Sequence, residues 1–264
     1  MIPHNICSYS KKYIENFKAR IKTKKHKNVK KYIYDPSKPQ VIPKHIYQIW
    51  HDLKEMPLSV QVSVEVLKKQ NPDFEHHLYD ENMCRQFIQE NFSDKIVKAY
   101  DSIQSHAIKA DLARYCIIYK KGGIYLDCKF YGINHFSFLH LLDKEYFCRD
   151  IERSLHGIYN AILICKPKNP ILFQCIQKVV QNVENKYYGP NALCIGPLMM
   201  KQFFTPNQIK SLELTFEVVN ITHRYICFHG YRILKINKEY YKNKKLKQNY
   251  WAKMWTTKKI YTKD

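Results

Sequence analysis

The stretch from Ser105 to Lys129 constrains the fold of this 264-residue chain more than any other part of its sequence. Apolar side chains recur there at spacings of three and four, which predicts an amphipathic helix capped by Ser105 and ended by Gly122. A glycine pair and a short apolar run then predict a tight turn into a buried strand that ends at Asp127. Because ligands bind beyond the carboxyl ends of strands in open α/β sheets, Asp127 is expected at a ligand-binding edge.

The same helix carries an acid and a base, Asp111 and Arg114, which stand three positions apart and therefore share a face. Spacing alone does not decide whether they form an ordinary surface ion pair or part of a site, and it leaves Asp127 open as a simple turn residue. A pocket that combined all three would suit a nucleotide sugar. Carboxylates accept hydrogen bonds from sugar hydroxyls, and cations offset the charge that builds on the diphosphate as the glycosidic bond breaks.

Strand-like and helix-like segments alternate along much of the chain. The expected strands lie near 41–50, 74–79, 124–127 and 159–165, and the expected helices lie at 81–100, 105–120, 171–183 and after 196. Valines recur at every second position between residues 59 and 67, which taken alone predicts a further strand. This alternation predicts an α/β fold with a mixed, largely parallel sheet flanked by helices.

Composition divides the chain into three parts. Residues 1–40 form a basic extension that ends at a proline-containing break, and 41–235 are long enough for one catalytic domain. Residues 236–264 form a basic, aromatic tail that is expected to pack on or near the active site. Its aromatic side chains, Trp255 among them, either cover a ligand pocket or pack against the core.

The chain is strongly basic, with 44 Lys and Arg against 23 Asp and Glu and a formal net charge of +21. Such a charge attracts polyanions, so a nucleic-acid-binding protein is one alternative function. The lysines are scattered among Asn, Ile and Tyr, however, as the codon bias of an AT-rich genome would produce. The sequence contains no nucleic-acid-binding motif, and no specific nucleic-acid partner is expected.

Neither the cysteines nor the paired histidines show a metal-binding pattern. The nine cysteines include no pair at Cys-x-x-Cys spacing, and several lie in apolar runs where a reduced thiol packs like a small hydrophobe. The pairs His76-His77 and His135/His140 favour ordinary surface or core roles. Reduced cysteines favour a reducing compartment.

No stretch approaches the ~20 apolar residues of a transmembrane helix, and the N-terminus has no signal-peptide core. We therefore expect no transmembrane segment and a cytoplasmic location, which would be the host cytoplasm or the virion if the source is a virus.

The central segment is similar to a known family motif. It reads Lys-Ala-Asp-x-x-Arg-Tyr from Lys109 and Gly-Gly-Ile-Tyr-Leu-Asp-Cys-Lys from Gly122. Four further blocks stand in the family's order: the run from Ile42 to Trp50, the run from Asn71 to Asp80, Asn160-Ala161 with Asn169-Pro170, and Gly196-Pro197. Together these blocks cover about residues 41–200. They resemble the DXD-motif sugar-binding region of glycosyltransferase family 32, which includes fungal enzymes that initiate mannan outer chains.

The resemblance implies a GT-A-like fold and a retaining transfer of a hexose from a UDP- or GDP-sugar to a glycan or protein acceptor. It also implies that residues 59–70 form a helix, against the period-two pattern, and we follow the resemblance there. Asp127 and Lys129 occupy the positions that it makes catalytic. The positions that it assigns to donor binding are Ile49, Trp50, Asp111, Arg114, Tyr125, Asp127 and Asn160.

The chain departs from the family at Lys129, which stands where the second acid of the DXD motif is expected. A protonated lysine cannot ligate a divalent ion. Three interpretations stay open. The Lys129 ammonium replaces part of a cation's charge; or Mn²⁺ or Mg²⁺ binds through Asp127 and a C-terminal ligand such as His229; or the chain binds a nucleotide sugar without catalysis.

Overall fold

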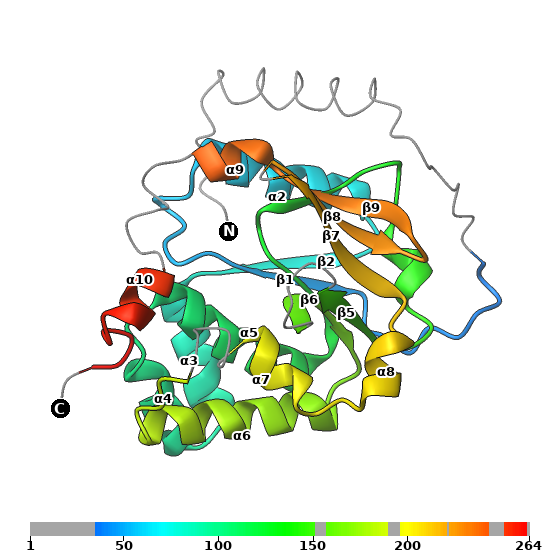
Figure 1. Ribbon diagram of the computed structural model, residues 1–264. Helices are drawn as coiled ribbons and strands as arrows, with labels where there is room; N and C mark the ends of the chain where they lie inside the picture. The colour runs from blue at the N-terminus through cyan, green and yellow to red at the C-terminus, as the bar shows by residue number, and fades with distance from the viewer. Residues whose placement is uncertain (1–34, 151–156, 190–195, 221, 243–250, 263–264) are drawn as a thin grey trace.

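The computed structural model describes residues 35–150, 157–189, 196–220, 222–242 and 251–262 (Figure 1). The strands are β1 (His45–Ile49), β2 (Glu75–Tyr79), β3 (Gly123–Leu126), β4 (Phe130–Gly132), β5 (Tyr146–Asp150), β6 (Ile158–Cys165), β7 (Leu214–Asn220), β8 (His223–Phe228) and β9 (Tyr231–Ile236). The helices are α2 (Leu58–Gln70), α3 (Glu81–Asn91), α4 (Asp94–Asp101), α5 (His106–Lys121), the 3-10 helix η1 (Phe138–Leu141), α6 (Pro170–Glu184), α7 (Pro197–Lys201), α8 (Pro206–Lys210), α9 (Lys238–Lys242) and α10 (Trp251–Thr256).

The nine strands form one sheet in the order β2-β1-β3-β6-β5-β7-β8-β9-β4. β1 runs parallel to β2 and β3, and β5 runs parallel to β7, whereas the remaining neighbours are antiparallel. The predicted α/β class with a mixed sheet is therefore confirmed, but the expectation of a largely parallel sheet is wrong. The error arises because β7, β8 and β9 follow one another through short turns, which join antiparallel strands.

The sheet curls so strongly that its far edge returns to β3. Only three residues separate β3 from β4 in the chain, yet β4 pairs with β9 at the far edge of the strand order. The connecting turn, residues 127–129, is held against the end of β9. The backbone N–H of Asn237, the residue after β9, donates to the Lys129 carbonyl oxygen at 2.9 Å. We call this turn the closure turn. It carries two of the residues expected to act on a ligand.

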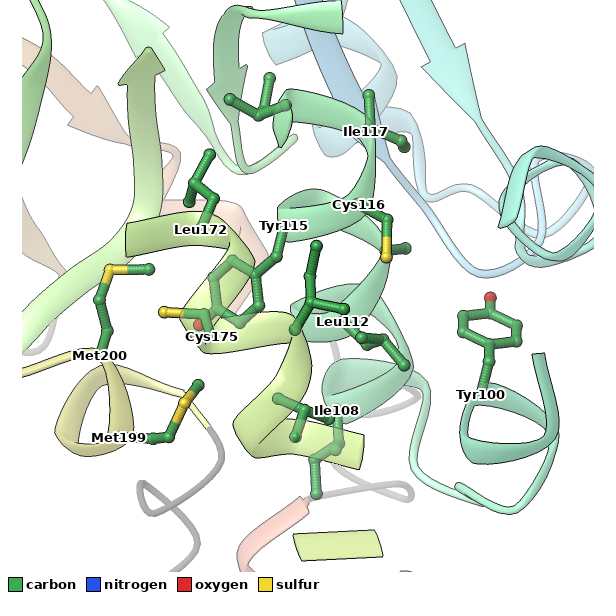
Figure 2. Close-up of a cluster of buried hydrophobic side chains, with 14 of the residues drawn as sticks. Tyr100, Ile108, Leu112, Tyr115, Cys116, Ile117, Leu172, Cys175, Met199 and Met200 are labelled. Atoms are coloured by element: carbon green, nitrogen blue, oxygen red, sulfur yellow. The ribbon is translucent and has the colours of Figure 1, made fainter. Parts of the chain in front are cut away.

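Two large apolar clusters fill the two sides of the sheet. One lies between the sheet and helices α3 to α7, with α5 at its centre, and the other lies within the curl of the strands. Figure 2 shows side chains of the first cluster, where Leu112 and Tyr115 from α5 meet Leu172 and Cys175 from α6. The predicted apolar face of α5 is thus buried as expected.

Helix α2 explains why its valines suggested a strand. Val60 and Val64 pack in one small apolar cluster with Trp50, and Val62 and Val66 pack in another with strand residues of β4 and β8. Each pair has the i, i+4 spacing of one helix face, so two faces are buried at once. Interleaving the two pairs produces the apparent period of two. The helix implied by the family resemblance is confirmed, and the strand prediction is wrong.

The tail folds back onto the domain. α9 contacts α2, while α10 contacts α5 and buries Trp255 in the helix-side core, where its indole nitrogen donates to the Gly189 carbonyl at 3.2 Å. Trp255 therefore packs against the core instead of covering the candidate site. The basic extension predicted for residues 1–40 lies outside the described residues except for 35–40, so its role stays a prediction.

Seven cysteines in the described ranges are buried and free of disulfides, as the apolar surroundings predict; Cys7 and Cys194 lie outside those ranges. Burial raises the pKa of the Cys227 thiol to about 12, so it is an inert thiol at neutral pH. No described helix combines the length and the apolar character needed to cross a bilayer.

Candidate active site

The turn from α5 into β3 requires its two glycines. Gly122 has φ of 66° and Gly123 has φ of 99°, a region that other residues rarely adopt. A Cβ atom would lie 2.6 Å from Pro167 Cδ at the first position and 2.8 Å from the His45 carbonyl oxygen at the second. These glycines let the strand start directly after the helix, and they fix where Asp127 emerges. Ser105 precedes the helix as expected, but its side chain makes no capping hydrogen bond.

Arg114 is the centre of the candidate site. Its Nη1 donates to Asp127 Oδ1 at 3.1 Å and to the Asn160 carbonyl at 2.9 Å, and its Nη2 lies 3.2 Å from Asp111 Oδ1. Its Nε donates to the Ala110 carbonyl at 3.0 Å, and the side chain is only 7% exposed. The guanidinium therefore holds both acids in one place, which the sequence predicted without being able to show.

Asp127 accepts hydrogen bonds from three sides. Its Oδ1 also accepts from the Tyr125 hydroxyl at 2.8 Å, and its Oδ2 accepts from Lys129 Nζ at 2.7 Å. The Arg114 guanidinium lies over the Tyr125 ring at 4.5 Å from its centroid. Tyr125 is 1% exposed, and its hydroxyl and ring contact Asp127 and Arg114, so it supports both side chains from the protein interior.

Asn160 and Gly196 complete the side of the site around Asp111. The Asn160 amide nitrogen donates to Asp111 Oδ1 at 2.9 Å and to the Tyr115 hydroxyl at 2.7 Å. A Cβ atom on Gly196 would stand 3.0 Å from Asp111 Oδ2 and 3.3 Å from the Asn160 amide nitrogen. The glycine that precedes α7 therefore keeps the second oxygen of Asp111 uncrowded.

The cluster is electrically balanced, with two carboxylates and two cations that share a mostly buried space. The side chains of Asp111, Asp127 and Lys129 are between 17% and 20% exposed. Burial raises the pKa of Asp111, and Arg114 only partly offsets that effect. Burial acts the same way on Asp127, but Lys129 and Arg114 outweigh it and hold the pKa of that carboxyl below its usual range. Asp127 is therefore held in its ionised form more firmly than Asp111.

Lys129 faces a group of aromatic rings. Its Nζ lies 5.7 Å from the ring centroid of Phe130, 5.8 Å from that of Tyr159 and 6.0 Å from that of Tyr240. Tyr240 belongs to α9, so the tail contributes to the surroundings of this ammonium. The rings and Asp127 together fix a flexible side chain in one place.

Ile49 and Trp50 lie at the end of β1, beside the closure turn. The Ile49 carbonyl accepts from Cys128 Sγ at 3.3 Å, while the Ile49 side chain packs into the helix-side core. Trp50 is 8% exposed and packs beside Cys128. Its indole nitrogen is buried and has no hydrogen-bond partner among the described residues. A buried donor of this kind favours a ligand acceptor.

The structure does not bring His229 to Asp127. His229 lies in the turn between β8 and β9, with its Nε2 3.7 Å from Glu213 Oε2. Lys129 contacts the other end of β9, roughly 20 Å away at the ~3.3 Å rise of each strand residue. The prediction that His229 completes a metal site with Asp127 is therefore not supported. The sequence did not show that the β8–β9 turn, which holds His229, lies at one end of β9 and that the carboxyl end of β3 lies near the other.

Residues 57–147 match the family model described as a glycosyltransferase sugar-binding region containing a DXD motif. This part of the chain is similar to the glycosyltransferases of that family, and we call residues 57–147 the sugar-binding region after the model that they match. The match confirms the recognition made from the Lys-Ala-Asp-x-x-Arg-Tyr and Gly-Gly-x-Tyr-x-Asp pattern. The sugar-binding region supplies Asp111, Arg114, Asp127 and Lys129, whereas Asn160 comes from beyond it.

Relatives of the sugar-binding region include several mannosyltransferases. The initiation-specific alpha-1,6-mannosyltransferase of Candida albicans is 32% identical over 38% of this chain and 27% of its own length. Inositol phosphoceramide mannosyltransferase 2 of Schizosaccharomyces pombe is 32% identical over 62% of this chain and 46% of its own length. An uncharacterized glycosyltransferase of Acanthamoeba polyphaga mimivirus is 36% identical over 33% of this chain and 35% of its own length. The chain thus spans less than half the length of each of these three relatives.

Among solved structures, the PaToxG glycosyltransferase aligns with a TM-score of 0.49 and 18% identity, over 73% of this chain and 76% of that chain.

Sequence reasoning missed the supporting partners of the sugar-binding region. The Tyr115 hydroxyl accepts from the Asn160 amide nitrogen, which the apolar spacing of the helix does not reveal. Tyr159 and Tyr240 were not linked to Lys129. The contacts join segments far apart in the chain, so only the Arg-Tyr pair of the motif offered a sequence signal. Two surface cavities of the described residues lie elsewhere, one beside residues 35–40 and one beside α6.

Proposed function

We propose that this chain is a glycosyltransferase of the GT-A type that moves a hexose from a nucleoside-diphosphate sugar to an acceptor hydroxyl. One observation carries the proposal: Asp111, Asp127 and Lys129 converge around Arg114 at the carboxyl end of β3. The relatives' names support mannose as the sugar to test first.

Each group has a role that its contacts favour. Asp111 Oδ2 and the partly exposed face of Asp127 can accept hydrogen bonds from sugar or ribose hydroxyls. Arg114 donates to protein acceptors from Nε and Nη1 and contacts Asp111 through Nη2, so its main role is to order the two acids that face the donor. Lys129 is the more exposed cation, and it can balance charge on the leaving diphosphate as the bond to the sugar breaks.

The residues present do not fit a divalent cation of the DXD type. Such a cation needs free carboxylate oxygens, but Lys129 Nζ stands 2.7 Å from Asp127 Oδ2 and the other oxygen accepts from Arg114 and Tyr125. The second acid of the motif is absent, and His229 lies too far away to replace it. We therefore propose that the Lys129 ammonium supplies positive charge at this position and that transfer needs no added Mn²⁺ or Mg²⁺.

The proposed transfer proceeds with retention at the sugar carbon. Among the described residues of the cluster, both oxygens of Asp127 are engaged by protein donors, and the open oxygen of Asp111 is assigned to hydroxyls of the donor, so the proposal gives neither acid the role of base toward an acceptor. In a same-face transfer the acceptor hydroxyl can lose its proton to the departing phosphate. An early product of β configuration from an α-linked donor, read by NMR of the anomeric proton, would contradict retention.

Asp127→Asn tests the proposal directly. The change keeps the size of the side chain but removes the charge that faces Lys129. We expect loss of transfer and donor hydrolysis by at least about 100-fold, with an unchanged far-UV circular dichroism spectrum. GDP- and UDP-hexoses are the donors to screen, each with EDTA and with Mn²⁺.

The outcomes separate the alternatives. Activity in EDTA supports the role of Lys129, and activity only with Mn²⁺ contradicts that role while leaving the transferase intact. A donor that raises the melting temperature without turnover identifies a nucleotide-sugar binder. Full activity of the Asp127→Asn variant would show that the site assignment is wrong.

A further inference from the structure

A second cluster of chemically active side chains lies at the opposite end of β1 from the candidate active site. His45 is the first residue of β1, and Glu75 and His77 lie on the adjacent edge strand β2. His45 pairs with Glu75 in register, and Tyr47 pairs with His77. Since alternate residues of a strand share a face, His45, Glu75 and His77 stand on the same face of the sheet.

The ligand atoms of these side chains lie close together. His45 Nδ1 lies 3.2 Å from His77 Nε2 and 3.3 Å from Glu75 Oε2, and His77 Nε2 lies 3.5 Å from the other carboxylate oxygen, Glu75 Oε1. One ligand atom from each residue can be chosen so that all three lie within 4.8 Å of one another. A tetrahedral zinc site with bonds of about 2.0–2.1 Å separates its ligand atoms by about 3.3–3.4 Å. The two imidazole nitrogens already have nearly this spacing, and a rotation of the Glu75 carboxylate would bring one of its oxygens to the third position.

Hydrogen bonds among the three side chains cannot satisfy all of their close contacts at once. An imidazole nitrogen carries either one hydrogen or one lone pair, directed along a single line in the ring plane. His45 Nδ1 and His77 Nε2 each lie within 3.5 Å of the other and of a Glu75 oxygen. Each nitrogen can form one hydrogen bond, so one of its two close contacts is left without one. An ion between the three side chains would meet both lone pairs and the carboxylate together.

The neighbours of the cluster hold its two rings in place. The Tyr47 ring stacks on the His77 ring, with centroids 4.7 Å apart and planes 11° from parallel. On the other side, Gly123 leaves room for His45, because a Cβ atom there would come within 3.2 Å of His45 Cβ. Glu75 is 65% exposed, so its carboxylate can turn to meet an ion.

We propose that His45, Glu75 and His77 bind a zinc ion or a similar divalent transition metal, with water as a fourth ligand. The donor set of two imidazoles and one carboxylate suits such metals better than Mg²⁺. Because the ligands come from both β1 and β2, the ion would fasten the edge strand to the sheet. The site is distinct from the candidate active site, which lies at the other end of β1.

Cobalt titration tests the proposal on the full, untagged chain after removal of metals with EDTA. Tetrahedral Co²⁺ absorbs visible light strongly, so the spectrum reports both stoichiometry and geometry. We expect one Co²⁺ per chain with a tetrahedral spectrum, displaced by one equivalent of Zn²⁺. His45→Asn and His77→Asn should each weaken Co²⁺ binding by more than about 100-fold. This loss is larger than the one expected for removing a residue that only hydrogen-bonds to a metal ligand.

A matched control is His229→Gln, since His229 also stands near a glutamate but lacks a third ligand in the described part of the chain. It should leave Co²⁺ binding unchanged. Circular dichroism in EDTA checks that every variant is folded, and zinc should raise the melting temperature of the wild type and of the control but not of His77→Asn. Equal affinity in folded His45→Asn, His77→Asn and wild-type protein would overturn the proposal. Sugar transfer plays no part in these readouts.

Discussion

The ion pair between Asp127 and Lys129 is the most consequential departure of this chain from the DXD pattern. Its atoms are 2.7 Å apart in a space where both side chains are about four-fifths buried. A buried ion pair is worth little net stability, because desolvation offsets the attraction. Stability alone therefore does not account for an ion pair at this position, and a role in ligand chemistry does.

Changing Lys129 separates that role from stability. We expect Lys129→Ala to lower the turnover rate by about 10²–10³-fold, because a preorganised positive charge is lost where the leaving group develops charge. Lys129→Asp rebuilds the paired acids of the motif and should make the remaining activity depend on Mn²⁺. Steady-state rates with EDTA and with Mn²⁺ measure both effects, and a fully active Lys129→Ala variant would contradict them.

The sequence predicted the principal residues of the site but only part of their roles. The convergence of Asp111, Arg114 and Asp127 follows from one helix, one glycine turn and one strand, all local in the chain. The burial of Tyr125 beneath Asp127 depends on which face of β3 meets the helices, which its short apolar run does not reveal. The position of His229 depends on non-local strand pairing and could not be read from spacing.

Helices α3 and α5 are joined at their starts by a small charged group. Glu81, the first residue of α3, contacts His106 and Lys109 in the first turn of α5. Burial favours the neutral acid, but hydrogen bonds from His106 and Lys109 outweigh it and lower the pKa of Glu81 from 4.5 to about 2. The ionised form of Glu81 therefore stabilises the folded state.

Glu81→Gln should make the protein less stable in a pH-dependent way. The stabilisation is complete above pH 4.5 and is lost as the pH falls toward 2, since the folded pKa lies below the unfolded one. We expect the variant to lose about 1–2 kcal/mol of unfolding free energy at pH 7, a value reduced for solvent screening. Urea unfolding at pH 7 and pH 4 measures it, and a difference between the two proteins that grows at pH 4 would contradict the assignment.

The secondary structure was predictable where the pattern is local and uninterrupted. Helix α5 and strands β2, β3 and β6 match the expected segments closely. Strands β7 and β8 were missed. Leu214, Phe216 and Val218 do alternate with polar residues, but the register shifts between Val218 and Asn220 and between Ile226 and Cys227 keep each regular run short. A bulge adds one residue and moves the alternation to the other face, so the pattern does not continue through the strand.

The architecture ties the sugar-binding region to residues far beyond it. The matched stretch ends at residue 147, yet β4 pairs only with β9 in the sheet, and the Asn237 amide holds Lys129. Strands β7 to β9 also line the second large apolar cluster. The net charge of +21 adds repulsion that this packing must overcome.

A chain that ends at Lys210 tests this dependence. It keeps the whole matched stretch, but it loses β7 to β9 and leaves β4 without its partner. We expect it to lack a cooperative thermal transition and any stabilisation by GDP- or UDP-sugars, both of which the full chain should show. Circular dichroism melts compare the two, and equal cooperative melting with equal donor response would refute this prediction.

The curl of the sheet has a consequence for how fragments of such proteins are chosen. A stretch delimited by resemblance to its relatives stops before the strand that secures the Lys129 carbonyl. The stretch that matches the family is therefore shorter than the part of the chain that holds Lys129 in place. A library that shuffles segments at residue 147 would separate Lys129 from its anchor, whereas exchanges that carry residues 123–237 together would preserve it.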